Sequence, residues 1–156
     1  MRTLVLGMGN PILSDDSVGV RVVRELEGKL DPTEVTVMEA SVGGLNLLDL
    51  LAGYERAVII DAIQTVGGKV GQVHRLTHES FDNTRYATSP HDVNFATALE
   101  MGRRLGLAMP QQIVILAIEV KEVTTFSEEC SPEVEAAIPV AVNMVLQELQ
   151  EGEQNA

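Results

Sequence analysis

The chain opens with Thr3-Leu4-Val5-Leu6-Gly7-Met8-Gly9-Asn10, and Asp15-Asp16-Ser17-Val18-Gly19-Val20 follows shortly after. The first stretch is an apolar run that ends in a glycine turn. The second places two adjacent carboxylates before a helical pattern. This order predicts a strand, a tight loop and the first turn of a helix. Because ligands of open α/β sheets bind where such loops leave the strands, residues 1–20 contain a candidate site.

The rest of the chain continues the alternation of strands and helices. Strands are expected at 3–6, 35–38, 57–60, 70–76 and 113–118, and helices at 18–30, 45–51, 89–105 and 132–152. The gap between 57–60 and 70–76 is too short for a crossover helix, so these two strands are expected to pair antiparallel. The order predicts an α/β fold with a five-stranded, mostly parallel sheet, one antiparallel strand and helices on both faces.

Length and composition are typical of one globular domain. The chain has 156 residues, so we expect a single α/β domain over 1–150 and a polar C-terminal tail over 151–156. A formal net charge of −12 argues against nucleic acid and anionic membranes as partners. The single cysteine, Cys130, excludes an intrachain disulfide, and no signal peptide or membrane span is recognised. We therefore expect a cytoplasmic protein.

Three polar residues are expected to meet at the carboxyl edge of the sheet. Asp16 follows the first strand, Asp61 ends the third, and His91 opens the helix that starts after the chain has returned to this edge. Each also has a structural interpretation: Asp15 or Asp16 as a helix cap, and Asp61 as a turn former. His91 is a poor choice for a first helical turn, because a cation there opposes the helix dipole. The convergence requires the first and third strands to be near each other.

Two carboxylates and an imidazole at one point favour a divalent metal. Carboxylates held close together repel, and a cation relieves that repulsion. A set of two oxygen ligands and one nitrogen ligand leaves coordination positions open, which suits transition metals. Ligand type alone does not separate nickel from zinc, cobalt or iron.

Other polar residues are interpreted as structural. His74 on an edge strand and His78 in a loop are expected at the surface. Cys130 is expected to be a half-buried small hydrophobic residue, because the acidic Glu128 and Glu129 beside it would raise the pKa of its thiol. The chain offers no convincing Ser/His/Asp or Cys/His arrangement for a nucleophile.

Two other classes of function remain open at this point. Gly7-Met8-Gly9, with Glu39 ending the second strand, partly matches a dinucleotide-binding fingerprint. The match is weak because position 12 is Ile12 instead of the third glycine, and because Asp15 and Asp16 would repel a pyrophosphate. A non-catalytic binding module or maturation chaperone is the other alternative, and turnover of a peptide substrate would separate it from an enzyme.

The chain resembles the [NiFe]-hydrogenase maturation endopeptidases over nearly its whole length. The motifs that carry the resemblance are Leu4-Val5-Leu6-Gly7-Met8-Gly9-Asn10, Asp15-Asp16, Gly19-Val20, Asp61-Ala62 and Ser89-Pro90-His91. The resemblance implies a three-layer α/β/α sandwich. It also implies removal of a C-terminal peptide from a hydrogenase large-subunit precursor after nickel insertion. The family's three metal-binding positions fall on Asp16, Asp61 and His91, and the first of these is often Glu in the family.

The resemblance also sets expectations for substrate and mechanism. Many relatives carry an acid followed by Gly-Gly-Thr after the second strand, whereas this chain has Glu39-Ala40-Ser41-Val42-Gly43-Gly44. We expect Gly43 and Gly44, together with Gly9 and Asn10, to contact substrate. Nickel is expected to arrive with the substrate, and zinc or cadmium could take its place. Asp16 or Asp61 is the candidate base. Of the oligomeric states, a monomer is favoured.

Overall fold

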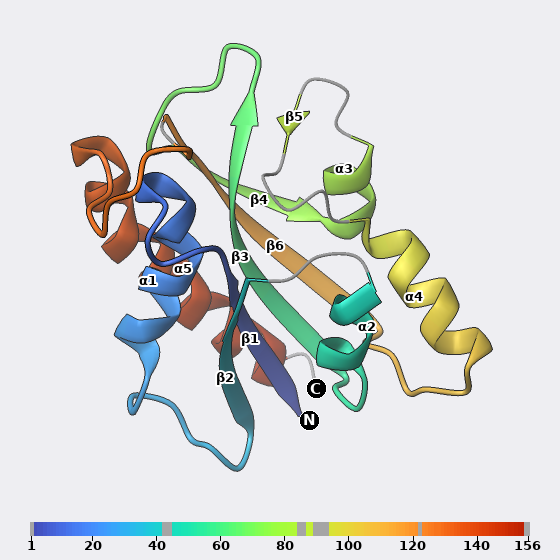
Figure 1. Cartoon of the computed structure of the whole chain (residues 1–156). Coiled ribbons are helices and arrows are strands. Elements are labelled where there is room, and N and C mark those ends of the chain that lie inside the picture. Colours follow the sequence, from blue (N-terminus) through green and yellow to red (C-terminus); the bar gives the residue numbers. More distant parts are fainter. Residues whose placement is uncertain (1, 42–44, 84–86, 89–93, 122, 155–156) are drawn as a thin grey trace.

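The apolar segments of the sequence form one sheet, with the strand order β2-β1-β3-β6-β4. The computed structural model describes residues 2–41, 45–83, 87–88, 94–121 and 123–154. The strands of this order are β1 (Thr3–Met8), β2 (Val35–Ala40), β3 (Arg56–Thr65), β4 (Val73–Thr77) and β6 (Gln112–Glu119). β2, β1, β3 and β6 are parallel, and β4 runs antiparallel along β6 at the sheet edge (Figure 1). The predicted mixed sheet is therefore confirmed.

Helices cover both faces of this sheet. α1 (Val18–Leu26) and α5 (Pro132–Gln154) lie on one face. α2 (Leu45–Leu51), α3 (His78–Asp82) and α4 (Phe95–Arg104) lie on the other (Figure 1). The arrangement is the expected three-layer α/β/α sandwich. No helix in the described part of the chain is long and apolar enough to span a membrane.

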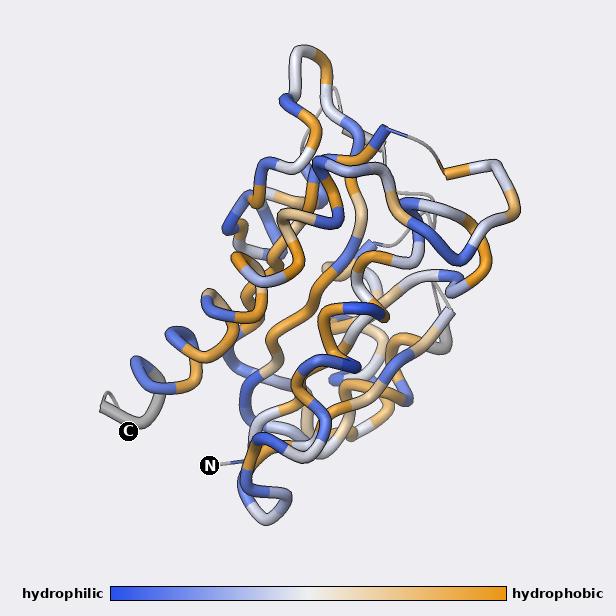
Figure 2. Tube along the Cα trace, turned by 90° about the vertical axis from the view of Figure 1, so that its left-hand side faces the viewer, coloured by the Kyte–Doolittle hydropathy of each residue, from blue (hydrophilic) through white to orange (hydrophobic). Residues whose placement is uncertain are grey.

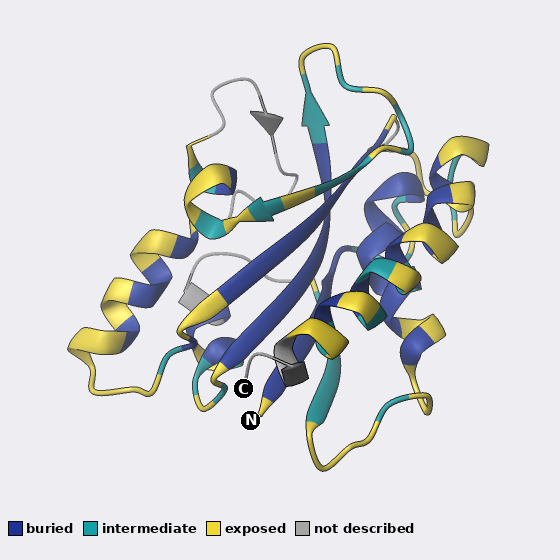
Figure 3. Cartoon of the chain, turned by 180° about the vertical axis from the view of Figure 1, so that it is seen from behind, coloured by how far each residue is buried: buried dark blue, intermediate teal, exposed yellow. Residues whose placement is uncertain are grey.

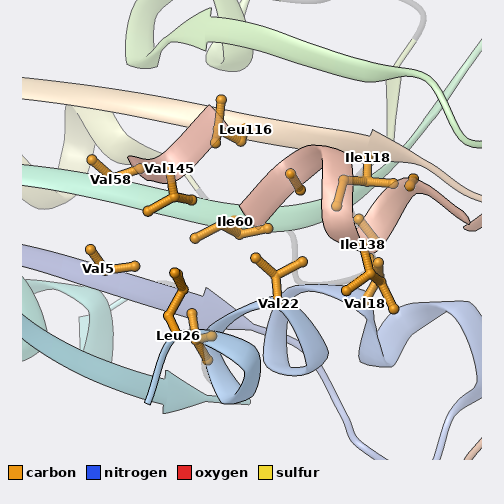
Figure 4. Packing of buried hydrophobic residues seen from close by; sticks show 14 of the residues in the cluster. Val5, Val18, Val22, Leu26, Val58, Ile60, Leu116, Ile118, Ile138 and Val145 are labelled. Atoms are coloured by element: carbon orange, nitrogen blue, oxygen red, sulfur yellow. The ribbon is translucent and has the colours of Figure 1, made fainter. Parts of the chain in front are cut away.

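Two apolar clusters, one on each face of the sheet, hold the layers together. On the α1 and α5 face, Val58 and Ile60 of β3 pack against Val22 and Val145 of the two helices (Figure 4). The central strands are buried and the outward helix faces exposed (Figure 3), and hydrophobic residues follow the same strands in the hydropathy view (Figure 2). Full burial of each such side chain is worth about 1.5–3 kcal/mol, so the central strands form a rigid base for the loops at their ends.

The pairing of β4 differs from the prediction. β4 was expected beside the preceding strand, β3, but it lies beside β6, which is inserted between the two. β3 is also longer than the predicted 57–60: it continues through Asp61 to Thr65. Its apolar inner part has parallel neighbours on both sides, β1 and β6, so no free edge is left for β4. Asp61 therefore lies within the strand rather than at its end.

The chain returns to the carboxyl edge before α4, as expected. β5 (Ala87–Thr88) pairs antiparallel with Gln64 and Thr65 at the far end of β3. α4 begins later than the predicted residue 89: Asn94 is its N-cap, and its side chain accepts a hydrogen bond from the Thr97 N–H. At the other end of the chain, α5 continues to Gln154, so the first four residues of the expected tail, 151–154, are helical.

Candidate functional site

Asp16 lies in a short 3-10 turn, η1 (Ser14–Ser17), between β1 and α1. Its side chain is buried, and its Oδ2 accepts a hydrogen bond from the Asn10 N–H at 3.1 Å. Gly9 has a φ of +151°, and a Cβ at this position would lie 2.1 Å from the carbonyl oxygen of Asp16. Only glycine allows the loop to wrap the turn so closely. The glycine turn of the opening stretch therefore folds around Asp16.

Close backbone packing brings this segment against β3. A Cβ on Gly19 would lie 2.4 Å from the carbonyl oxygens of both Met8 and Ile60. Gly7 of β1 pairs with Ile60 in the parallel ladder. Asp61 is the residue after Ile60. The required proximity of the first and third strands is thus confirmed: Asp16 lies in the turn after β1, and Asp61 lies in the adjoining strand β3.

Asp61 is as deeply buried as Asp16. It is 1% exposed and Asp16 is 2% exposed, and the Asp61 Oδ1 accepts the N–H of Ala62 at 2.8 Å. Carboxylates are hard oxygen donors, and this donor chemistry fits a divalent cation. Among the described residues there is no group of three or more side chains placed to hold a metal ion. The third predicted ligand, His91, lies outside the described residues.

The predicted substrate-contact residues divide into two pairs. Gly43 and Gly44 lie outside the described residues. Gly9 and Asn10 shape the loop around Asp16: the Asn10 N–H donates to that carboxylate, and the Asn10 Oδ1 accepts from the Ile12 N–H at 3.1 Å. Contact of Gly9 and Asn10 with a substrate stays a prediction.

Asp15, treated in the sequence as a possible cap, has a different role. Its carboxylate is fully buried and accepts the N–H of Lys121 at 2.9 Å and the N–H of Ser131 at 2.6 Å. The Ser131 hydroxyl donates to the same carboxylate at 2.8 Å. Asp15 therefore fastens the turn that carries Asp16 to the loop after β6 and to the start of α5. Two adjacent acids before a helix are compatible with a local cap and with a long-range contact. The sequence pattern alone therefore does not show which of the two Asp15 makes.

Cys130 is half-buried, as expected, but the cause of the raised pKa of its thiol differs from the prediction. Burial raises the pKa of its thiol, while a hydrogen bond with the Ser17 hydroxyl and the charge of Arg21 oppose the rise. The carboxylates of Asp15 and Glu135 add to the rise, in place of the predicted Glu128 and Glu129. A protonated thiol at neutral pH is a poor nucleophile, so Cys130 is not placed for catalysis.

A further acid at this edge was missed in the sequence. Glu119, the last residue of β6, is 2% exposed, and its Oε1 lies 3.3 Å from the His74 Nε2. His74 is 23% exposed by side chain, so it is half-buried instead of a surface residue. Glutamate after an apolar strand is common, and only the tertiary structure places His74 against it.

The features behind the dinucleotide alternative have structural explanations. Glu39 forms a two-point ion pair with Arg24, with both N···O distances 3.0 Å. That pairing lowers the pKa of Glu39 and raises the pKa of Arg24. Gly7 and Gly9 are required by close contact with Gly19 and Asp16, so both serve backbone packing.

Known proteins are similar to this chain over most of its length. The family model described as hydrogenase maturation protease, HycI, matches residues 20–148. Hydrogenase 2 maturation protease of Escherichia coli K12 is 32% identical, over 97% of this chain and 92% of that protein.

Two solved structures share the fold at similar identity. The hydrogenase maturating endopeptidase HybD from E. coli matches with a TM-score of 0.81 at 30% identity, over 97% of this chain and 94% of that one. The [NiFe] hydrogenase maturation protease HybD from Thermococcus kodakarensis matches with a TM-score of 0.73 at 29% identity, over 94% and 98% of the two chains. This chain belongs to the hydrogenase maturation protease family.

Proposed function

We propose that this protein is an endopeptidase that removes a C-terminal peptide from a [NiFe]-hydrogenase large-subunit precursor after nickel has been inserted. The observation that carries the proposal is that two buried carboxylates, Asp16 in the turn after β1 and Asp61 in the adjoining strand β3, occur in a chain of this family. The precursor is the partner, and the reaction takes place in the cytoplasm with the protein acting as a monomer.

Nickel belongs to the substrate in this proposal. Asp16, Asp61 and His91 would bind the nickel of a loaded precursor, and a precursor without metal would not supply the cation that these buried carboxylates would bind. The difference in binding makes metal loading the condition for cleavage. Zinc or cadmium could fill the same positions, because carboxylate and imidazole ligands do not select strictly among these ions.

One carboxylate has a second task in the reaction. After the precursor is bound, Asp16 or Asp61 accepts a proton from the attacking water as general base. The rigid packing of Gly7, Gly9 and Gly19 supports this role, since it fixes where the acidic segment lies relative to β3.

A single incubation tests the proposal. The protein is mixed with nickel-loaded and with nickel-free precursor, and loss of the C-terminal peptide is followed as a mobility shift. We expect cleavage of the loaded form only, and no cleavage by His91→Ala. His78→Ala is the matched control and should cut normally. Equal cleavage of both forms would overturn the recognition role of nickel. A stable complex without cleavage would favour the chaperone alternative.

A further inference from the structure

Two apolar side chains are exposed on loops that flank Asp16. Phe126, in the loop between β6 and α5, is 78% exposed, and Ile12, in the loop between β1 and η1, is 48% exposed. The other two phenylalanines of the chain, Phe81 and Phe95, are buried and pack edge to face. Single exposed apolar residues are common on protein surfaces, so the position of Ile12 and Phe126 has to be considered together with their exposure.

The two exposed residues belong to segments that lie side by side. Leu13 and Ser127 form an isolated parallel β-bridge. The Ser127 N–H donates to the Ile12 carbonyl oxygen, and the Ser127 carbonyl oxygen accepts the Ser14 N–H, both at 2.9 Å. Ile12 and Phe126 directly precede the bridge on their two segments. Backbones paired in this way lie about 5 Å apart, so Ile12 and Phe126 form one exposed apolar pair.

The apolar pair is fixed to the turn that carries Asp16. The loop between β6 and α5 runs beside this turn (Figure 1), and the Ser14 hydroxyl donates to the Thr125 carbonyl oxygen at 2.5 Å. Ser14 has a φ of +47°, a left-handed conformation that a residue other than glycine keeps only where its surroundings hold it. Little backbone entropy is lost when a partner contacts segments that are already ordered. The apolar pair is thus presented by a rigid part of the molecule.

The charge around the apolar pair indicates which partner it fits. Residues 120–131 include three glutamates and one lysine. Glu128 and Glu129 follow Phe126 closely and are exposed. Arg21 reaches the loop, 3.5 Å from the Glu128 carbonyl oxygen, but its charge is paired with Glu135 at 2.7 Å. An apolar contact with excess negative charge beside it is complementary to a polypeptide segment that has an apolar side chain near a lysine or arginine.

We propose that Ile12 and Phe126 form a docking site for the hydrogenase large-subunit precursor. The occupant is a segment of the precursor that carries an apolar side chain and a neighbouring lysine or arginine. The inference rests on the proposed endopeptidase function and adds a contact outside the two buried acids. Docking here holds the precursor against the two segments that fix the turn of Asp16, so residues that do not react help to set where the cleaved bond lies.

Phe126→Ser tests the docking site. Burial of a phenylalanine side chain corresponds to about a 10–100-fold change in binding. We expect the KM for nickel-loaded precursor to rise by about 10-fold or more with kcat nearly unchanged, because the side chain contributes to binding alone. Phe126→Leu should retain most of the wild-type affinity, and Ile12→Ser should raise KM by a smaller factor. All these side chains are exposed, so urea unfolding should have the same midpoint in each variant.

The chain provides a matched control in Leu105. It is also an exposed apolar residue, 68% exposed, but it lies between α4 and the start of β6, at the opposite edge of the sheet from Asp16. Leu105→Ser should keep the wild-type KM and kcat. The double variant Glu128→Gln with Glu129→Gln tests the charge: it should raise KM at low salt, and the difference from the wild type should shrink as salt screens the charges.

The outcomes separate this inference from the proposed function. If the wild type binds loaded precursor without cutting it, the proposed function fails, and weaker binding by Phe126→Ser would still support the docking site. If the wild type cuts and Phe126→Ser has the same KM, the proposed function stands and the docking site is wrong. An equal rise in KM for Leu105→Ser would also overturn it. So would a wild-type dimer that Phe126→Ser converts to a monomer, since a second copy would then cover the apolar pair.

Discussion

Carboxylates are buried near both ends of the parallel strands, but in different surroundings. The amino edge is the side of the sheet where the parallel strands begin, and the carboxyl edge is the side where they finish. At the amino edge, Glu148 of α5 accepts hydrogen bonds from two arginines: Arg56 NH2 donates at 2.8 Å, and Arg75 donates through Nε and NH2. Arg56 is 3% exposed and also donates to the Glu148 carbonyl oxygen at 2.6 Å. The negative charge of Glu148 is thus balanced within the protein, and it connects α5 to β3 and β4.

At the carboxyl edge, buried acids are held by dipoles. Backbone N–H groups donate to Asp15, Asp16 and Asp61, and Glu119 accepts from Thr65 and contacts His74. Dipoles stabilise a carboxylate without supplying a full positive charge. Two arginines balance the charge of Glu148 inside the fold, whereas the proposed function requires the carboxylates of Asp16 and Asp61 to respond to a cation that arrives from outside. Under the proposed function, the amino edge serves the structure and the carboxyl edge serves the chemistry.

The largest expected effect is the loss of cleavage in Asp16→Asn. The amide oxygen can still accept the Asn10 N–H, so the loop keeps its shape while the negative charge is removed. We expect the single-turnover rate on nickel-loaded precursor to fall by about 10³-fold or more, equivalent to about 4 kcal/mol. Wild-type cleavage by this variant would show that the carboxylate charge has no part in the reaction.

At the amino edge, Glu148→Gln should lower stability and spare activity. Removing one partner leaves buried arginine charge uncompensated, which costs about 3–5 kcal/mol. Urea unfolding measures the loss, and the cleavage rate per folded molecule should stay at the wild-type level. Glu135→Gln is the control: it breaks the exposed pair with Arg21, at 2.7 Å, and should cost less than about 1 kcal/mol. Equal losses in the two variants would contradict the structural role of Glu148.

Asp15→Ala should lower both the free energy of unfolding and the cleavage rate, because Asp15 joins the turn that carries Asp16 to the loop after β6 and to the start of α5. Removal of the carboxylate takes the acceptor away from the part-buried N–H groups of Lys121 and Ser131, at about 1–3 kcal/mol. The turn carrying Asp16 loses its anchor, so cleavage should slow as well. Asp31→Ala, at an exposed carboxylate that accepts from Thr33, is the control: it should leave cleavage unchanged and cost less stability than Asp15→Ala.

The smallest effect is expected for Cys130→Ala. Cleavage should not change, since burial raises the pKa of this thiol and keeps it protonated at neutral pH. The folded pKa lies above the unfolded value of about 8.5, so the thiol stabilises the fold below that pH, and this contribution is lost as the pH rises through the folded pKa. Unfolding measured between pH 8 and 10 should show a shallower fall for the variant. Loss of cleavage would return Cys130 to the list of candidate nucleophiles.

Much of the fold could be predicted because its signals are local. The apolar runs around Val5, Val58 and Ile115 define buried strands, and the topology placed Asp16 and Asp61 at one edge. The partner of β4 could not be predicted, because it depends on β6, which comes about forty residues later in the chain. Loop length restricted the connection between β3 and β4, but it did not determine which strand would occupy the edge.

The site was predictable only in part, for a similar reason. Asp16 follows the glycine turn that ends β1, and Asp61 follows an apolar run, although β3 continues past it to Thr65. The roles of Asp15 and Glu119 depend on contacts with Ser131 and His74, which are remote in sequence. Long-range hydrogen bonds leave no periodic pattern, so only the folded chain reveals them.

The assignment of chemistry to the carboxyl edge is tested most directly by Asp61→Asn. Cleavage of nickel-loaded precursor and urea unfolding are measured on the same preparation. We expect the cleavage rate to fall by about 10³-fold or more, while the free energy of unfolding changes by less than about 1 kcal/mol, because the amide can keep the bond from the Ala62 N–H. Cleavage at the wild-type rate, or a loss of cleavage that follows unfolding of the variant, would contradict the division between the two edges.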